Sequence, residues 1–293
     1  MLNKKLLIVA PSNYAKSTQM LVDEAKKVFS TVELVPINDI SLKLDEKTWS
    51  MIYKDTNLAE FDYCLPRIDA KRALHGYHVI RFMDHLGIDK PYSAETILMA
   101  HNKFETLEQM KKAGVPIPTT YTAGSVTAAK DILKRMDYPV VIKVVDGFGG
   151  RGVVMVEDFE SAQSVVETMK ILKKEIIIEE FVGSGGEDIR AFIVGGEIVA
   201  GMKRKAKTGD FRSNLFSGGK ATHFTVTGEF KDVALKAAAA AGSDIIAIDM
   251  IDSPDGPKVI EVNINPGIKG IQKVTNINVA GRIIEFIAKR LEK

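Results

Sequence analysis

Two apolar segments near the end of the chain, IIAIDMI (245–251) and KVIEVNIN (258–265), contain acidic residues at positions that constrain the fold strongly. Both segments are rich in β-branched residues, and the turn sequence SPDGP between them predicts a hairpin. If the turn centres on Asp255, then Asp249 lies opposite Glu261. Asn263 then lies diagonally across from Asp249 on the same face. The chain must therefore contain a sheet in which two acids and an amide meet.

This acidic pair needs a positive partner, because like charges opposite each other destabilise a sheet and the other neighbours are apolar. We expect a metal ion to supply the charge. Oxygen ligands from Asp249, Glu261 and Asn263 suit Mg²⁺ or Mn²⁺ rather than zinc. Mg²⁺ usually takes one or two carboxylates and completes its shell with water and substrate phosphates, which predicts a nucleotide nearby. The alternative is an exposed hairpin face with solvated acids.

A glycine-rich loop, GFGGRG at residues 147–152, matches the pattern GxGxxG. It leads into VVMVED, which is typical of a strand, whereas a dinucleotide-binding loop opens a helix. A Walker A loop is excluded as well, because no Gly-Lys-Ser/Thr follows. A loop between two strands can fold over phosphates and offer backbone N–H groups, including those of Gly149 and Gly150. The alternative is an ordinary hairpin with a roomy turn.

Lys143 lies just before this loop, in the segment VVIKVV. The apolar residues on both sides of the pleat predict a strand that is covered on both faces. A buried ammonium is costly unless an anion meets it. We therefore expect Lys143 to bind a phosphate held under the glycine loop, the alternative being a lysine that snorkels at a strand end.

The remaining pattern divides the chain into three segments. Strands near 4–10, 31–37 and 61–68 alternate with helices near 18–29 and 77–86, which predicts a parallel α/β domain over residues 1–95. Residues 96–182 contain the glycine loop and begin with one helix over 94–113 that stops at Gly114. Residues 183–293 contain two strands joined by Gly195-Gly196, the acidic hairpin and a final helix from about Val279.

Charge and composition narrow the function. The net charge of +2 does not indicate non-specific nucleic-acid binding, and the single cysteine excludes an internal disulfide. The first apolar run is too short for a signal peptide or a membrane span, so we expect a soluble, cytoplasmic protein. Basic residues gather in 203–220. Three interpretations are open: a solvated face, a nucleic-acid patch and a loop around polyphosphate. The mixture in FRSNLFSGG favours the last interpretation.

With these segments the chain resembles the RimK family of ATP-grasp enzymes, which add glutamate to carboxylates of proteins or coenzymes. The resemblance is carried by residues 188–219, by IAIDMI at 246–251 and by VIEVNINPGIKGIQKVTNINVAGRII at 259–284. LPRI at 65–68, residues 101–118 and residues 139–153 match less closely. The family implies an ATP-grasp fold, α/β with α+β character in the ATP-grasp part. An N-terminal parallel α/β domain would precede two lobes that enclose ATP.

The resemblance also implies roles for residues. Lys103 and Lys143 would hold the ATP phosphates, Glu180 and Phe181 would line the adenine, and Glu187 or Asp188 would hold the ribose. Arg212, Ser213 and Asn214 would occupy the nucleotide and acyl-phosphate region, with Arg204 and Arg212 as catalytic residues. Asp249, Glu261 and Asn263 would bind two Mg²⁺ or Mn²⁺ ions.

The implied reaction joins a carboxylate to an amine through an acyl phosphate, with glutamate as the amine donor. The carboxylate acceptor would be a coenzyme or a protein C-terminus. A ligase that uses another amino acid or amine is the main alternative. Two further alternatives are a basic nucleic-acid-binding module and a nucleotide-binding regulator without catalysis. We also expect a homo-oligomer and no membrane partner.

Overall fold

The computed structural model describes residues 1–12, 15–145, 147, 151–183, 185–207, 212–213 and 218–293. It has the mixed α/β architecture that the sequence predicts, with a parallel sheet in the N-terminal region and antiparallel sheets in the rest of the chain. Within these residues, none of the helices combines the length and the apolar character needed to cross a bilayer.

The N-terminal region is built on a three-stranded parallel sheet of order β2-β1-β6. Its strands are β1 (Leu2–Ala10), β2 (Phe29–Pro36) and β6 (Tyr63–Pro66), and its helices are α1 (Lys16–Val28) and α2 (Ala73–Leu86). A small antiparallel sheet, β3 (Ser41–Leu44), β4 (Trp49–Tyr53) and β5 (Thr56–Asn57), was not expected from the sequence. The loop after β6 ends in a short 3-10 turn at Ala70–Arg72.

The prediction of one helix over 94–113 is wrong, because this segment contains two helices, α3 (Ala94–His101) and α4 (Lys103–Lys112). Asn102 separates them with an extended backbone, and its side chain accepts hydrogen bonds from the N–H groups of Phe104 and Glu105. Asparagine is a favoured N-cap because it satisfies these otherwise unpaired donors. The break makes Lys103 the first residue of α4.

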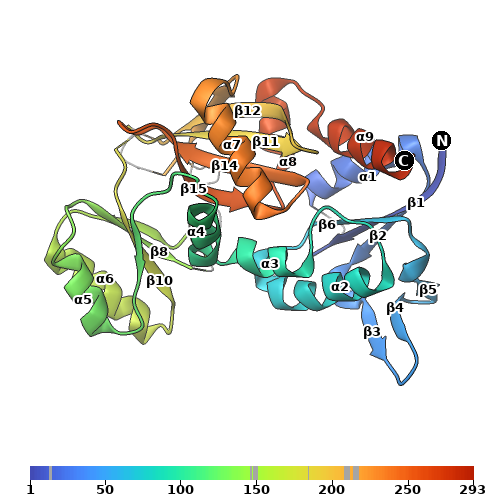
Figure 1. The fold of residues 1–293 in the computed structure, drawn as a ribbon, viewed down its shortest axis with the longest axis horizontal. Helices are drawn as coiled ribbons and strands as arrows, with labels where there is room; N and C mark the ends of the chain where they lie inside the picture. Colours follow the sequence, from blue (N-terminus) through green and yellow to red (C-terminus); the bar gives the residue numbers. More distant parts are fainter. Residues whose placement is uncertain (13–14, 146, 148–150, 184, 208–211, 214–217) are drawn as a thin grey trace.

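The central region forms an antiparallel sheet of order β7-β10-β8-β9, which stands apart from the rest of the chain in Figure 1. Its strands are β7 (Thr120–Thr122), β8 (Val140–Val144), β9 (Val153–Val156) and β10 (Ile176–Glu180). The helices α5 (Val126–Leu133) and α6 (Phe159–Ile171) pack on one face of the sheet and bury a separate apolar core. Alternation along β8 places Val141 and Lys143 on the opposite face.

The C-terminal region is a five-stranded antiparallel sheet of order β13-β12-β11-β14-β15. Its strands are β11 (Glu187–Val194), β12 (Glu197–Lys205), β13 (Lys220–His223), β14 (Ile245–Ile251) and β15 (Lys258–Asn263). Gly195 and Gly196 both have positive φ in the turn between β11 and β12, as a tight hairpin requires. The helices are α7 (Gly228–Ala241), α8 (Ile268–Thr275) and α9 (Val279–Leu291).

The two faces of this large sheet are covered differently. On one face, Ile246 and Ile248 share a core with α7 and with Leu7 and Val9 of β1. On the other face, α8 and α9 pack over one end of the strands, and the other end bears charged side chains. Each of the four sheets in the described part of the chain lies within one predicted segment. We therefore propose 1–95, 96–182 and 183–293 as the domains.

Candidate active site

Five charged side chains lie together on the large sheet, across four neighbouring strands. Arg204 on β12 pairs in register with Asp188 on β11. Arg190, also on β11, pairs with Asp249 on β14, which in turn pairs with Glu261 on β15. We call these five residues the charged row. Charges alternate along it until Asp249 and Glu261, which are both acidic.

The predicted Asp249–Glu261 pairing is confirmed, although the hairpin differs near its turn. Met250 pairs with Val259, so a β-bulge at Ile260 separates the turn from the site. The bulge inserts one residue and restores the register that a turn centred on Asp255 would give. The two acids and Asn263 therefore share one face of the hairpin.

Two arginines already balance the charge on Asp249, and the sequence analysis, which assigned this part to a metal ion, did not foresee them. Arg190 forms a bidentate pair with Asp249, with both N···O distances at 2.6 Å. Arg204 forms a second fork to Asp188, also at 2.6 Å, and its Nη2 lies 2.8 Å from Asp249 Oδ2. Asp188, Arg204 and Asp249 are all at least 95% buried.

These contacts decide the protonation of the charged row. Burial alone would raise the pKa of Asp249, but Arg190 and Arg204 outweigh it and lower the pKa to about 2. Burial would lower the pKa of Arg204, but Asp249 and Asp188 outweigh it and raise the pKa well above its usual value. The network is therefore ionised at neutral pH.

The hairpin end of the charged row still fits a divalent cation. Two arginines face three carboxylates, so the row has one negative charge in excess. No hydrogen bond or ion pair engages the carboxylate of Glu261 within the described residues, and Asn263 Nδ2 is buried without a partner there. Asp249 accepts three N–H bonds, and a carboxylate has about four lone-pair sites.

The ligand set would be incomplete without the amide and the substrate. In the described part of the chain, no group of three or more His, Cys, Asp or Glu side chains could hold a metal ion. Two carboxylates, the oxygen of Asn263 and phosphate oxygens are the kind of set that Mg²⁺ uses. The donor chemistry therefore fits Mg²⁺ or Mn²⁺ and excludes a zinc-type site.

Lys143 also has a partner that the sequence analysis did not foresee. Its Nζ lies 2.5 Å from Oε2 of Glu179, which is on the neighbouring strand β10. The Glu179 side chain is only 3% exposed, and its Oε1 is buried without a partner among the described residues. The anion that meets the buried lysine in this structure is thus a carboxylate of the protein.

A central cavity lies between the central sheet and the charged row. The predicted residues that line it are Lys103, Lys143, Glu180, Phe181, Glu187, Asp188, Arg204, Arg212, Ser213, Asp249 and Glu261. Asn263 lines the cavity beside it. Gly149, Gly150 and Asn214 lie outside the described residues. The structure thus gathers the described members of the predicted site around two adjoining cavities.

Several of these side chains are held by neighbours. The ammonium of Lys103 donates to the carbonyl oxygens of Val145, at 3.4 Å, and Gly147, at the start of the glycine loop. Glu180 pairs with Lys258 at 2.6 Å, and its backbone N–H donates to Thr119. Ser213 Oγ donates to Asp188 at 2.5 Å. Lys103 and Ser213 both line the central cavity.

The basic residues on β12 are matched by acids on β11. Lys203 and Lys205 pair with Glu187 at 2.8 and 2.9 Å, and Arg204 pairs with Asp188. Glu187 and Asp188 therefore balance part of the positive charge counted in 203–220. This arrangement argues against a nucleic-acid patch, which would present unmatched cations to a phosphate backbone.

Arg190 and Glu179 are site residues that the sequence analysis missed. Arg190 lies two residues after Asp188 in β11, so alternation alone places both on one face. Glu179 gave no such signal, because alternation along β10 places it on the face opposite the predicted residue Glu180. For Arg190 the available signal was a charged residue that alternation places on the face of a predicted site residue, whereas Glu179 enters the site only because β10 lies beside β8.

Comparison with known proteins identifies the family. Residues 100–287 match the RimK-like ATP-grasp domain, and residues 5–97 match the RimK PreATP-grasp domain. A protein from Coxiella burnetii (strain Dugway 5J108-111), named "Probable alpha-L-glutamate ligase", is 33% identical over 97% of this chain and 95% of its own length. A protein of the same name from Nitrosococcus oceani is 35% identical over the same shares.

Solved structures show the same fold. The RimK domain ATP-grasp protein from Sphaerobacter thermophilus covers 96% of this chain and 98% of its own, with a TM-score of 0.74 and 20% identity. The ATP-grasp ligase PsnB, in complex with a minimal precursor, covers 100% of both chains, with a TM-score of 0.76 and 15% identity. The chain therefore belongs to the RimK-like family of ATP-grasp ligases.

Proposed function

We propose that this ATP-dependent, C–N bond-forming ligase adds L-glutamate to a carboxylate of a protein or coenzyme. The observation that carries the proposal is the charged row, which faces Lys103 and Lys143 across the central cavity. Cations on both sides of one space suit a reaction in which negative charge gathers on transferred phosphate. The identity of the amine donor is supported by the name of the relatives that match the full chain.

The reaction would proceed in two steps. A carboxylate oxygen of the acceptor attacks the γ-phosphorus of ATP, the bond to ADP breaks, and an acyl phosphate forms. The amine of glutamate, having released a proton to solvent, then attacks the acyl carbon. The C–N bond forms as the bond between the acyl carbon and the phosphate oxygen breaks, and the second amine proton leaves with the inorganic phosphate. Both steps need positioned positive charge rather than a protein nucleophile, and this agrees with the residues that line the cavity.

The lysines, Arg204 and the residues of the acidic hairpin have different parts in this proposal. Lys103 and Lys143 bind phosphate oxygens, and Arg204, fixed by its two carboxylates, stabilises charge on the transferred phosphoryl group. Members of the family use ATP with divalent metal ions. Such an ion, held by Asp249, Glu261 and Asn263, would neutralise phosphate charge.

The ion pair between Lys143 and Glu179 leads to a first prediction. Lys143→Met is expected to lower the affinity for a non-hydrolysable ATP analogue at least tenfold, about 1.4 kcal/mol. It should also lower the free energy of unfolding by about 1–3 kcal/mol, because it leaves a buried carboxylate unpaired. Adding Glu179→Gln should restore most of the stability but not the affinity. Calorimetry and urea unfolding measure the two effects, and wild-type affinity in the double variant would contradict the phosphate role.

The amine donor leads to a second prediction. With Mg²⁺ and a panel of carboxylate acceptors, L-glutamate should stimulate ADP release at least tenfold more than L-aspartate or L-glutamine. Mass spectrometry should find the acceptor heavier by one glutamyl residue. A different amino acid that supports ADP release and amide formation, with glutamate inactive, would favour the alternative donor and leave the ligase chemistry in place.

A further inference from the structure

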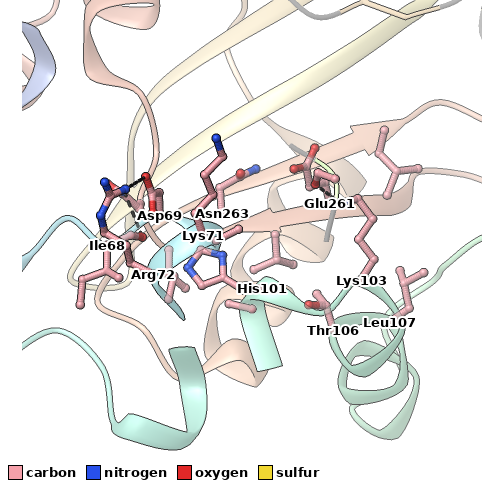
Figure 2. Close-up of a pocket in the computed structure, with 17 residues that line it drawn as sticks. Ile68, Asp69, Lys71, Arg72, His101, Lys103, Thr106, Leu107, Glu261 and Asn263 are labelled. Atoms are coloured by element: carbon pink, nitrogen blue, oxygen red, sulfur yellow. Dashed lines mark hydrogen bonds and ion pairs between the residues drawn. The ribbon is translucent and has the colours of Figure 1, made fainter. Parts of the chain in front are cut away.

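A second cavity of about 370 Å³ adjoins the central one and contains residues to which no role is assigned above. Its walls come from the loop after β6, the end of α3, the start of α4 and the strand β15 (Figure 2). Lys103, Gly147, Ile260 and Glu261 line both cavities. A molecule in this adjoining cavity would therefore meet the phosphate end of the nucleotide at a shared wall.

The adjoining cavity has an unusual share of unsatisfied polar groups. The described residues contain nine buried side-chain nitrogen or oxygen atoms that lack a hydrogen-bond partner. Five of these atoms belong to residues of this one wall, namely Asp69, Arg72, His101, Asn263 and Asn265. Buried polar groups are nearly always paired in folded proteins, and a cluster of exceptions needs a reason. A polar ligand that draws these side chains inward would supply the missing partners.

The charges of the adjoining cavity indicate the class of ligand. Lys71, Arg72 and Lys103 contribute three positive charges, and Asp69 and Glu261 contribute two negative ones. Burial lowers the pKa of His101, so the imidazole adds no charge at neutral pH. The net charge of +1 complements an amino acid that has two carboxylates and one ammonium, since such a molecule has a net charge of −1.

The positions of the charges set an orientation. Figure 2 shows the paired side chains of Asp69 and Arg72 at one end of the cavity and Lys103 with Glu261 at the other. Asp69 holds the Arg72 guanidinium at 2.7 Å, which directs the planar donor group. Lys71 precedes Arg72 in the same 3-10 turn, and it is exposed. Carboxylates of a ligand would bind at the first end, which leaves its amine near the shared wall.

We propose that the adjoining cavity binds the amino-acid donor, with its carboxylates on Lys71 and Arg72 and its amine toward Glu261. This inference rests on the proposed function and assigns the donor to one of its two cavities. The volume is at the small end of the ~300–1,000 Å³ range of small-molecule sites, as an amino acid requires. A protein or coenzyme acceptor would instead reach the shared wall from outside this cavity.

The test is calorimetric titration of L-glutamate into the full chain saturated with a non-hydrolysable ATP analogue and Mg²⁺. Arg72→Gln and Lys71→Gln should each weaken glutamate binding at least tenfold and change the affinity for the analogue less than twofold. Lys71 is exposed, so its variant keeps the test valid if Arg72→Gln fails to fold. Arg81→Gln is the matched control, because it breaks the surface ion pair of Arg81 with Glu95, whose residues line neither cavity.

The outcomes separate this proposal from the one on which it rests. Unchanged glutamate affinity in both variants overturns the cavity assignment and leaves glutamate as the donor. An effect on the KM of the acceptor alone also overturns it. If the wild type binds a different amino acid and the variants weaken that binding, the cavity assignment stands and the choice of glutamate fails. A wild-type enzyme that binds no amino acid in this state overturns the assignment as well.

Discussion

Replacing Glu261 by glutamine is expected to lower Mg²⁺-dependent ADP release at least 100-fold, a loss of about 3 kcal/mol of transition-state stabilisation. Glu261 is the member of the charged row that has no hydrogen-bond or ion-pair partner among the described residues. Its charge is therefore the one most available to a phosphate-bridging cation. Glutamine keeps the shape of the side chain but removes the anionic ligand.

The same substitution should leave the free energy of unfolding without metal within about 0.5 kcal/mol of the wild-type value, or slightly above it. It turns a row of two cations and three anions into a balanced one and removes the repulsion of Asp249. Thermal melts without metal and ADP release across a Mg²⁺ titration measure the two effects. Glu197→Gln, at the opposite end of the same sheet, is the control. Normal activity of the Glu261 variant at low Mg²⁺ would exclude Glu261 from the metal site.

The sequence predicted the parts of this site that depend on neighbours within one hairpin. Alternation and a turn position were enough to place Asp249 opposite Glu261, and the bulge at Ile260 compensated for a shift that the sequence does not reveal. The β-strand that contains Lys143 and the strand after the glycine loop could be predicted for the same reason. Such contacts are short-range along the chain, so local pattern determines them.

The partners of these residues could not be predicted, because they come from strands whose order the sequence does not state. Arg190 meets Asp249 only because β11 lies beside β14, and the two residues are 59 positions apart. Lys143 meets Glu179 because β10 lies beside β8. In both cases the sequence showed that a buried charge needs a partner, but the choice between a protein group and a ligand depended on strand order.

The break between α3 and α4 was predictable in principle. Asn102 followed by Glu105 is a capping pattern, and the continuous apolar periodicity around it favoured one long helix instead. The adjoining cavity is different, because its walls come from segments near residues 70, 101 and 262. No local motif contains these three segments, so only the fold reveals that they meet.

Replacing Arg204 by glutamine is expected to have the largest effect on stability, a loss of about 3–5 kcal/mol in the free energy of unfolding at pH 7. The guanidinium is 4% exposed and is shared by two carboxylates, which are themselves buried. Glutamine is shorter, offers two N–H donors instead of five, and has no charge. Asp188 would keep Ser213 as a donor, and Asp249 would keep Arg190.

This loss should depend on pH in a direction fixed by Asp249. Its pKa in the folded protein is about 2, below the ordinary value of 3.8, so the arginines contribute stability above pH 4 that disappears as the pH falls through 2. For Asp249 this contribution is about 2 kcal/mol in the wild type. The difference in the free energy of unfolding between wild type and Arg204→Gln should therefore become smaller between pH 4 and pH 2, because protonated carboxylates no longer need the guanidinium.

Urea unfolding of both proteins at pH 7, 5, 4, 3 and 2, together with ADP release at pH 7, tests this expectation. Arg204→Gln combined with Asp188→Asn is the informative control, because it removes one of the two carboxylates left short of a partner. We expect it to recover part of the lost stability and none of the activity, since only Arg204 would stabilise charge on the phosphoryl group. A gap in stability that stays constant from pH 7 to pH 2 would show that the guanidinium acts by packing rather than by charge. Full activity in either variant would exclude Arg204 from phosphoryl transfer.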